Sequence, residues 1–219
     1  MSLNTERCLQ YVQAMSLTPE EIEQNWKNFS SLCTKLGDRS PAVIAMLEEV
    51  EERLCLCPAS AKLEFHGAFP GGLVDHSLRV LNHLLALNKA FDWRLRKDSM
   101  IIGALFHDIG KLGMPGKGSE NDFYRPQTDG WKADKRGEVY EYNNDIPFLT
   151  TPDRSVFIMQ HYGIQLTPDE WCAIRCNDGF VWEPNKAYCL KLHPLAYGVM
   201  TADYHSTCVE KGVRGWVHE

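Results

Sequence analysis

The sequence contains no long uninterrupted apolar stretch. Of its 219 residues, 44% are hydrophobic and 24% are charged, and no segment approaches the roughly 18 consecutive apolar residues of a membrane-spanning helix. We expect no signal peptide at residues 1–7, because no apolar region follows a basic start there. We therefore expect one well-buried domain in the cytoplasm, without a membrane partner.

Paired cysteines and an excess of positive charge are also missing. The eight cysteines include no Cys-x-x-Cys pair, since Cys55 and Cys57 are two positions apart and Cys172 and Cys176 four. This spacing argues against a disulfide framework and against cysteine-bound structural zinc. The net charge of −6 disfavours binding of long duplex nucleic acid, which needs clustered Lys and Arg to displace counterions. Small anionic substrates remain compatible with this charge.

Helix start signals recur along the chain. Thr18 and Glu21 form a capping box at the start of a helix expected over residues 18–36, and an earlier helix is expected over residues 5–15. Ser40 and Pro41 begin a third helix, whose apolar stripe is typical of core packing and runs as far as Cys55. Further helices are expected to begin near Gly72, to cover residues 98–109, and to begin at Thr151-Pro152, at Thr167-Pro168 and at His193-Pro194, the last running to Tyr204.

An adjacent histidine and aspartate, His107 and Asp108, follow the apolar segment of residues 100–106. Burying them is costly unless a partner satisfies them, and a divalent cation is such a partner. Neighbouring helix residues lie about 100° apart around the axis, so both reach one ion only at a helix end or a kink, which Gly110 supplies. Asp203, among small and apolar residues of the last helix, is a further candidate ligand. The alternative interpretation is a helix C-terminus with a surface histidine and aspartate.

A glycine-rich stretch leads into the helix near Gly72. Three glycines and a proline within six positions let the backbone pass close to another group. His66 and His76 bracket this entry, and His76, Arg79 and His83 share one helix face. His83 lies about 10 Å beyond His76 along the helix, so it cannot bind the same ion. We expect it to have a structural role or to support a ligand.

Residues 121–142 predict a small β-hairpin with a turn at residues 127–130. The hairpin combines cations with aromatic side chains beside the expected metal centre. Such a combination can hold a phosphate and stack a base, whereas the alternative is a solvated hairpin with aromatic cross-strand pairs. The candidate substrate-binding residues are Arg79, Arg125, Trp131, Lys132, Lys135 and Arg136.

Three motifs resemble the HD superfamily of metal-dependent phosphohydrolases over roughly residues 63–207. They are GGLVDHS at residues 71–77, HDIGK at 107–111 and TAD at 201–203. The first motif, with His66 ten residues before His76, is similar to the Gly-Gly-Leu-x-x-His segment of HD domains in bacterial 3′-to-5′ exoribonucleases and related uncharacterised hydrolases. The resemblance implies an all-α helical bundle with the hairpin as an excursion. The domain is then residues 1–219, with N-terminal helices of residues 1–60 packed on a core of residues 63–207.

The resemblance also implies a metal site with His76, His107, Asp108 and Asp203 as its ligands. Two imidazoles and two carboxylates suit Mn²⁺, Fe²⁺, Co²⁺, Ni²⁺ or Mg²⁺. Some members of the superfamily hold a second ion with extra histidines. This chain departs from that pattern, because Asn177 stands where we would expect such a histidine, and one ion per site is therefore favoured.

Three other polar residues are expected around this site. His161 is expected near the substrate rather than on an ion. Asp75 and Asn177 are candidates for orienting the imidazoles.

The predicted activity is hydrolysis of a phosphate ester of a nucleotide or similar small phosphorylated metabolite by metal-activated water. A nucleotidase or a deoxynucleoside triphosphate hydrolase is preferred over a phosphodiesterase. Asp108, His66 and His161 are candidate general acids or bases. Lys111 either contacts a phosphoryl oxygen or forms a salt bridge with a nearby carboxylate.

Two other functions stay open. One is a phosphodiesterase or 3′-to-5′ exonuclease acting on short oligonucleotides or cyclic nucleotides. The other is a catalytically silent module that senses a nucleotide. A homo-oligomer is compatible with each of these functions.

Overall fold

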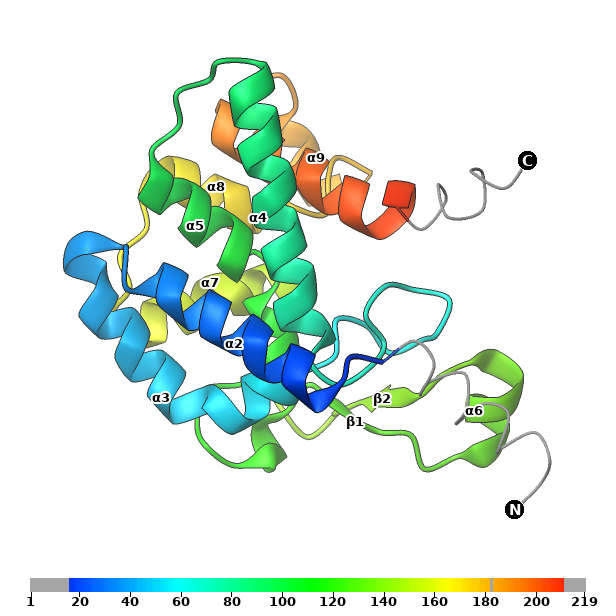
Figure 1. Cartoon of the computed structure of the whole chain (residues 1–219). Coiled ribbons are helices and arrows are strands. Elements are labelled where there is room, and N and C mark those ends of the chain that lie inside the picture. Colours follow the sequence, from blue (N-terminus) through cyan, green and yellow to red (C-terminus); the bar gives the residue numbers. More distant parts are fainter. Residues whose placement is uncertain (1–15, 182, 211–219) are drawn as a thin grey trace.

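The computed structural model describes residues 16–181 and 183–210 and has an all-α fold with one small two-stranded sheet in this part, as predicted (Figure 1). The helix expected over residues 5–15 lies outside the described residues. The α-helices are α2 (Pro19–Cys33), α3 (Ser40–Leu56), α4 (Gly72–Ala90), α5 (Lys97–Phe106), α6 (Gly130–Arg136), α7 (Thr151–His161), α8 (Pro168–Arg175) and α9 (Pro194–Tyr204). Short helical turns are η1 (Gly37–Arg39), η2 (Ile109–Leu112), η3 (Ser119–Asn121), η4 (Glu183–Tyr188) and the π-helical η5 (His205–Val209); the strands are β1 (Tyr124–Pro126) and β2 (Tyr140–Tyr142).

Several of these helices begin at or next to the capping residues that the sequence predicts. The capping boxes at Thr18 and Thr167 are both formed, with each threonine accepting from the backbone three residues later. The α7 cap is Thr150, one residue before the predicted start, and its side chain accepts from the Asp153 N–H. Helix α2 ends at Cys33, earlier than the expected residue 36.

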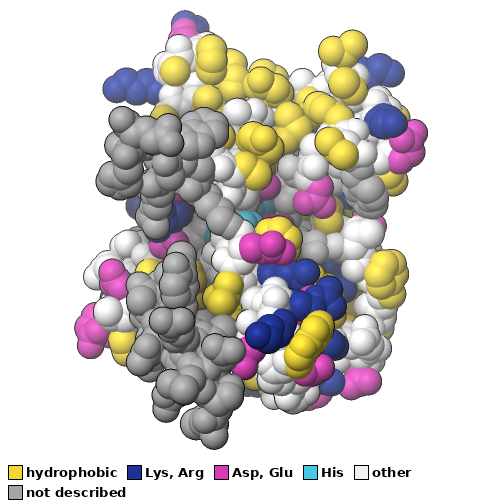
Figure 2. Space-filling model, turned by 90° about the vertical axis from the view of Figure 1, so that its right-hand side faces the viewer, with side chains coloured by type: hydrophobic (Ala, Val, Ile, Leu, Met, Phe, Trp, Pro, Cys, Tyr) yellow, Lys and Arg dark blue, Asp and Glu magenta, His cyan; other side chains and the backbone are white. Residues whose placement is uncertain are grey.

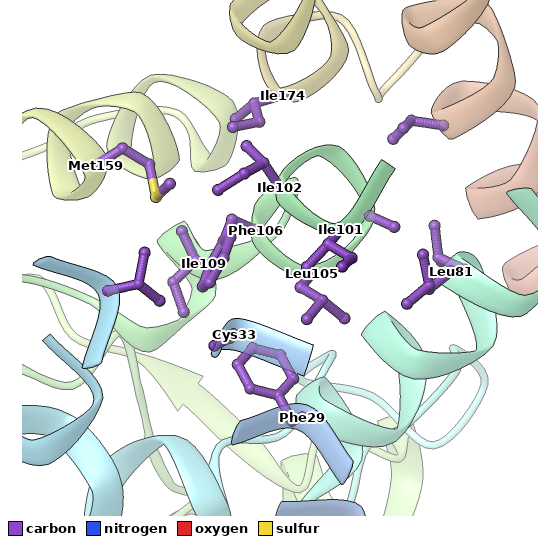
Figure 3. Close-up of a cluster of buried hydrophobic side chains, with 14 of the residues drawn as sticks. Phe29, Cys33, Leu81, Ile101, Ile102, Leu105, Phe106, Ile109, Met159 and Ile174 are labelled. Atoms are coloured by element: carbon purple, nitrogen blue, oxygen red, sulfur yellow. The ribbon is translucent and has the colours of Figure 1, made fainter. Parts of the chain in front are cut away.

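Helix α5 is the centre of the core. Every side chain from Ser99 to Phe106 is buried, as expected for a helix that is apolar all round its surface. Figure 3 shows its residues facing Phe29 of α2, Leu81 of α4 and Ile174 of α8. The predicted apolar segment therefore lies in the core, and it ends at the candidate site.

Helix α4 runs through the middle of the molecule, with α5 and α8 on one side and α9 on the other (Figure 1). It packs against α5, α9, α2 and α3, while α7 packs against η2 and α8. The N-terminal helices α2 and α3 thus lie directly on the remaining helices. Among residues 16–181 and 183–210, no helix has both the length and the apolar character needed to cross a membrane.

The predicted hairpin is a two-stranded ribbon that carries a helix. Strands β1 and β2 are antiparallel, with Tyr124 opposite Tyr142 and their ring centroids 5.7 Å apart. The expected turn at residues 127–130 is wrong, because α6 begins there with Asp129 as its N-cap and ends at the left-handed Gly137. The ribbon and α6 project from one side of the helices (Figure 1).

Candidate metal centre

The chain bends between His107 and Asp108. His107 caps the C-terminus of α5 with helical torsion angles, whereas Asp108 has φ −111° and ψ 11° and precedes η2. This is the predicted kink, and it lets two adjacent side chains face one point. Gly110 does not end α5, contrary to the prediction, because the helix stops at Phe106. A Cβ atom at Gly110 would lie 2.2 Å from the carbonyl oxygen of Thr151, so the glycine is needed for close packing against α7.

Side chains from three parts of the fold meet at this bend. His76 lies one turn into α4, and Asp203 lies in the last turn of α9. The Nε2 atom of His76 is 3.1 Å from Nε2 of His107, 3.1 Å from Asp203 Oδ1 and 3.7 Å from Asp108 Oδ2. His107 Nε2 lies 3.6 Å from Asp108 Oδ2 and 3.8 Å from Asp203 Oδ1. We call these four residues the HD cluster.

The HD cluster fits a divalent cation. Ligand atoms bound about 2.0–2.2 Å from one ion lie roughly 3.0–3.5 Å from one another, close to the distances above. The Nδ1 atom of His107 is 2.9 Å from the carbonyl oxygen of Ala104, so in the neutral ring Nδ1 carries the proton and the Nε2 lone pair faces the cluster. The buried Oδ1 of Asp203 has no aligned hydrogen bond within the described part of the chain. These orientations are compatible with both imidazoles and both carboxylates acting as ligands of one ion.

Lys111 neutralises part of the negative charge at the centre. Its Nζ lies 2.5 Å from Asp108 Oδ2, and its side chain is largely buried. Burial alone would raise the pKa of Asp108, but the Lys111 ammonium and then His107 outweigh it and lower that pKa to about 2. Burial likewise opposes the Lys111 charge, and Asp108 raises the Lys111 pKa above its usual range. The salt bridge predicted as one alternative for Lys111 is therefore formed.

His66 lies over the HD cluster. Its ring centroid is 4.4 Å from that of His76, and its buried Nε2 has no hydrogen-bond partner among the residues described. The glycine-rich stretch explains this placement, since a Cβ at Gly72 would lie 2.1 Å from the carbonyl oxygen of Gly67. Burial and the neighbouring His76 lower the pKa of His66 to about 3, which keeps the ring neutral.

One of the two residues expected to orient the imidazoles lies at the cluster, but it contacts a carboxylate instead. The Nδ2 of Asn177 donates to Asp108 Oδ1 over 3.3 Å, and the side chain is buried. Asp75 is directed elsewhere, because its carboxylate accepts from Arg79 Nε and from Asn25 Nδ2. The expectation that Asp75 orients a ligand is wrong, since Arg79 and Asp75 form an i, i+4 ion pair on α4.

Sequence reasoning gave no role to Asp178, which follows Asn177. The low-dielectric surroundings and then the charge of Asp108 raise the pKa of Asp178 to about 6, although much of its side chain reaches solvent. The only signal in the sequence was its position beside Asn177.

His161 lies outside the HD cluster. It is the exposed last residue of α7 and lines an open cavity with Arg125, Asp145 and Phe157. It is six residues, about 9 Å of helix, beyond Ser155, whose Oγ accepts from the Gly110 N–H. The His161 ring packs against Phe157 and Tyr162, so its expected acid or base role stays a prediction. Arg125 is paired with Asp145 at 2.7 Å.

The other candidate substrate residues lie at the surface. Arg79 is engaged by Asp75 and lies 3.6 Å from Glu210. Trp131 is 62% exposed on α6, and the carbonyl oxygen of Gly137, at the end of α6, accepts from the Leu63 N–H in the loop that leads to His66. Figure 2 shows the side of the molecule that lies on the right in Figure 1. Histidine atoms are visible near its middle, and a group of Lys and Arg side chains lies below them, over α6. The cations on α6 are Lys132, Lys135 and Arg136.

Comparison with known families agrees with this geometry. The family model of the HD domain matches residues 73–161, which include His76, His107 and Asp108, and the fold brings Asp203 to them from outside the matched segment. No curated protein sequence and no solved structure matches the chain. Residues 73–161 thus carry an HD domain, and this match supports the superfamily of HD-domain hydrolases.

Proposed function

We propose that this protein hydrolyses a phosphate ester of a nucleotide or a similar small phosphorylated metabolite, with one divalent cation held by the HD cluster. The observation that carries the proposal is the convergence of two imidazoles and two carboxylates from α4, the α5–η2 bend and α9. A cation such as Mn²⁺, Fe²⁺, Co²⁺, Ni²⁺ or Mg²⁺ supplies charge neutralisation at a phosphoryl oxygen and a lowered pKa for water.

Lys111 connects this centre to a space that can hold a substrate. The residue contacts Asp108 and also lines a cavity of about 490 Å³ together with Tyr124, Tyr140 and Lys117. We assign the Lys111 ammonium to a phosphoryl oxygen, where a fixed positive charge stabilises the developing negative charge. The tyrosine rings offer stacking surfaces for a base or another flat group.

The surroundings of His66 and Asp178 suit different roles toward the substrate and water. His66 is neutral, with a pKa of about 3, and its Nε2 has no partner in the described residues, so this nitrogen can accept a hydrogen bond that orients the attacking water. Asp178, with a pKa of about 6, retains a proton at mildly acidic pH and can donate it to the leaving oxygen. A general acid and a general base each contribute about 10²–10⁴-fold to such reactions.

The test is a substrate panel with defined metal content. Protein stripped with chelator is reloaded separately with Mn²⁺, Co²⁺, Ni²⁺ or Mg²⁺ and given an aryl phosphate, an aryl phosphodiester, and nucleoside mono- and triphosphates. We expect hydrolysis of at least one monoester or nucleotide, and its loss in Asp108→Ala. The Asp145→Ala variant is the matched control, because Asp145 is exposed and pairs with Arg125 outside the HD cluster.

Each other result selects an alternative. Hydrolysis of the phosphodiester alone would replace the proposal by a phosphodiesterase. Metal binding without hydrolysis of any member of the panel would favour a nucleotide-sensing module. Full activity of Asp108→Ala would refute the assigned role of the HD cluster.

A further inference from the structure

We propose that a second, separate metal site lies on the surface formed by His83, His205 and Glu210. One ligand-type atom from each residue lies within 4.8 Å of the other two. The His83 Nε2 atom is 2.7 Å from Glu210 Oε1, and the centroids of the two imidazole rings are 4.3 Å apart. The site is distinct from the HD cluster, because His83 lies seven residues, about 10 Å of helix rise, beyond His76 on α4.

A local departure from α-helical geometry creates this group. In an α-helix, residues five apart point about 140° away from each other. Residues His205–Val209 instead form a π-helical turn, in which the Glu210 backbone N–H bonds to the carbonyl oxygen of His205. A π-turn places residues i and i+5 next to each other, and here both are side chains that bind metals. The turn thus brings His205 and Glu210 together opposite His83.

The chemistry of the group favours a borderline transition ion. Two imidazoles and one carboxylate suit Zn²⁺, Ni²⁺ or Cu²⁺, and three protein ligands leave a further coordination position for water. The side chains of His83 and Glu210 are 26% and 30% exposed, so an ion and its water can reach them. Arg79 lies against the other carboxylate oxygen, Glu210 Oε2, at 3.6 Å, which leaves Oε1 directed at His83.

Occupancy of this site would tie the end of α9 to α4. The turn that carries His205 follows Asp203 by two residues, so an ion here would restrain the helix end that holds Asp203 against His76. The expected role is therefore structural support for that end of the α4–α9 pair, and it does not depend on the proposed hydrolytic activity.

The experiment counts bound Zn²⁺ in tag-free, full-length protein. Chelator-stripped samples of wild type, His205→Gln and the His83→Gln/His205→Gln double variant are dialysed against Zn²⁺, and zinc per chain is measured by elemental analysis. We expect both variants to bind one equivalent fewer than wild type. The control, His161→Gln, removes an exposed histidine from another element and should bind as much as wild type.

The difference between wild type and His205→Gln decides the proposal whatever the HD cluster binds. If the HD cluster takes no zinc, wild type still binds one equivalent and His205→Gln none. Equal zinc content and equal affinity in wild type and both variants would overturn the inference. As a second readout, Zn²⁺ should raise the melting temperature of wild type more than that of Glu210→Gln, a variant that keeps the shape of the side chain, and an equal shift would also count against the site.

Discussion

At the level of single residues, charge balance explains the HD cluster. Two carboxylates, the buried Asp108 and the partly buried Asp203, lie beside two imidazoles, and the Nε2 atom of each imidazole lies within 3.8 Å of both carboxylates. Like charges in low-dielectric surroundings are costly. Without a metal ion, Lys111 is the cation that directly contacts Asp108. Lys111 and a bound ion would therefore both reduce the repulsion between the carboxylates of Asp108 and Asp203.

Replacing Lys111 by methionine should destabilise the metal-free protein by about 3–5 kcal/mol at neutral pH, since it leaves Asp108 buried without its cationic partner. The folded-state pKa of Asp108 is about 2, below its value of about 3.9 in an unfolded chain. The ionised Asp108 carboxylate thus contributes its full stabilisation above about pH 4, and this stabilisation is lost as the pH falls towards 2. Urea unfolding of wild type and Lys111→Met at pH 7 and pH 3 should show a large difference at pH 7 and a smaller one at pH 3. A pH-independent difference would contradict this account.

Under the proposed function His66 acts on the attacking water, so His66→Gln should reduce kcat by about 10²-fold and leave metal content unchanged. The alternative is a role as ligand, because His66, His76 and Asp108 together could also hold an ion. Steady-state kinetics together with elemental analysis check both parts. His161→Gln, on the far part of α7, should change kcat by less than about twofold, as expected for a group that makes no contact with the reacting atoms. Loss of metal from His66→Gln would instead make His66 a ligand.

At the level of elements, helix α7 holds the bend that carries His107 and Asp108. The hydroxyl of Ser155 accepts from the Gly110 N–H and donates to the carbonyl oxygen of His107. The guanidinium of Arg154 donates to the carbonyl oxygen of Gly110. The geometry of the HD cluster is therefore set by α7 as well as by the elements that supply its ligands.

Gly110→Ala should destabilise the protein by about 1–3 kcal/mol or more, and it should weaken metal binding because η2 or α7 must shift. The added Cβ would lie 2.2 Å from the Thr151 carbonyl oxygen. Gly130→Ala is the matched control, since a Cβ there meets no atom within 4 Å in the described structure. At the first turn of α6, alanine should be neutral or stabilise by about 0.5–1 kcal/mol. Chemical denaturation and metal titration of both variants test the pair, and equal effects would refute the packing argument.

The features that the sequence predicted well depend on local contacts or on a spaced motif. Thr18 and Thr167 begin helices through bonds to the backbone three residues later, and such bonds need no distant partner. The core position of α5 followed from its uninterrupted apolar residues. The HD cluster was predicted from the resemblance of its motifs, and the fold places those four side chains together.

The errors have physical causes too. The helix in the ribbon was missed although Asp129 and Gly137 are cap residues at its two ends, because the aromatic residues on either side favoured a simple hairpin. Asp75 was assigned to the site although Arg79, four residues later, is its natural partner. The place of His66 over His76 depends on close packing between Gly67 and Gly72, a tertiary contact that spacing alone does not reveal.

At the level of the whole molecule, an ion in the HD cluster would join α4, the α5–η2 bend and α9, which also pack against one another in the apolar core. A ligand present at about 100 times its Kd stabilises the folded state by about 2.7 kcal/mol. For a chain of this length, each kcal/mol raises Tm by about 2–4 °C. Adding a chelator should therefore lower Tm by roughly 5–10 °C, as calorimetry can measure.

This metal effect on Tm should be larger at pH 8 than at pH 6. Burial opposes the charged form of His107, but Asp108 and Asp203 outweigh it and raise the His107 pKa above its usual value. In metal-free protein, the protonated ring thus contributes stability that is complete below about pH 6.5 and is lost as the pH rises through the raised pKa. The ion replaces that proton, so at pH 6 metal binding competes with protonation of His107. At pH 8 the metal-free protein has lost the stability contributed by the proton, and the ion therefore stabilises the folded state more. In the His205→Gln background, which removes the second site, Asp203→Asn should show little response to chelator at either pH. A response that is equal at both pH values with Asp203 intact would exclude His107 as a ligand that exchanges its proton for the ion.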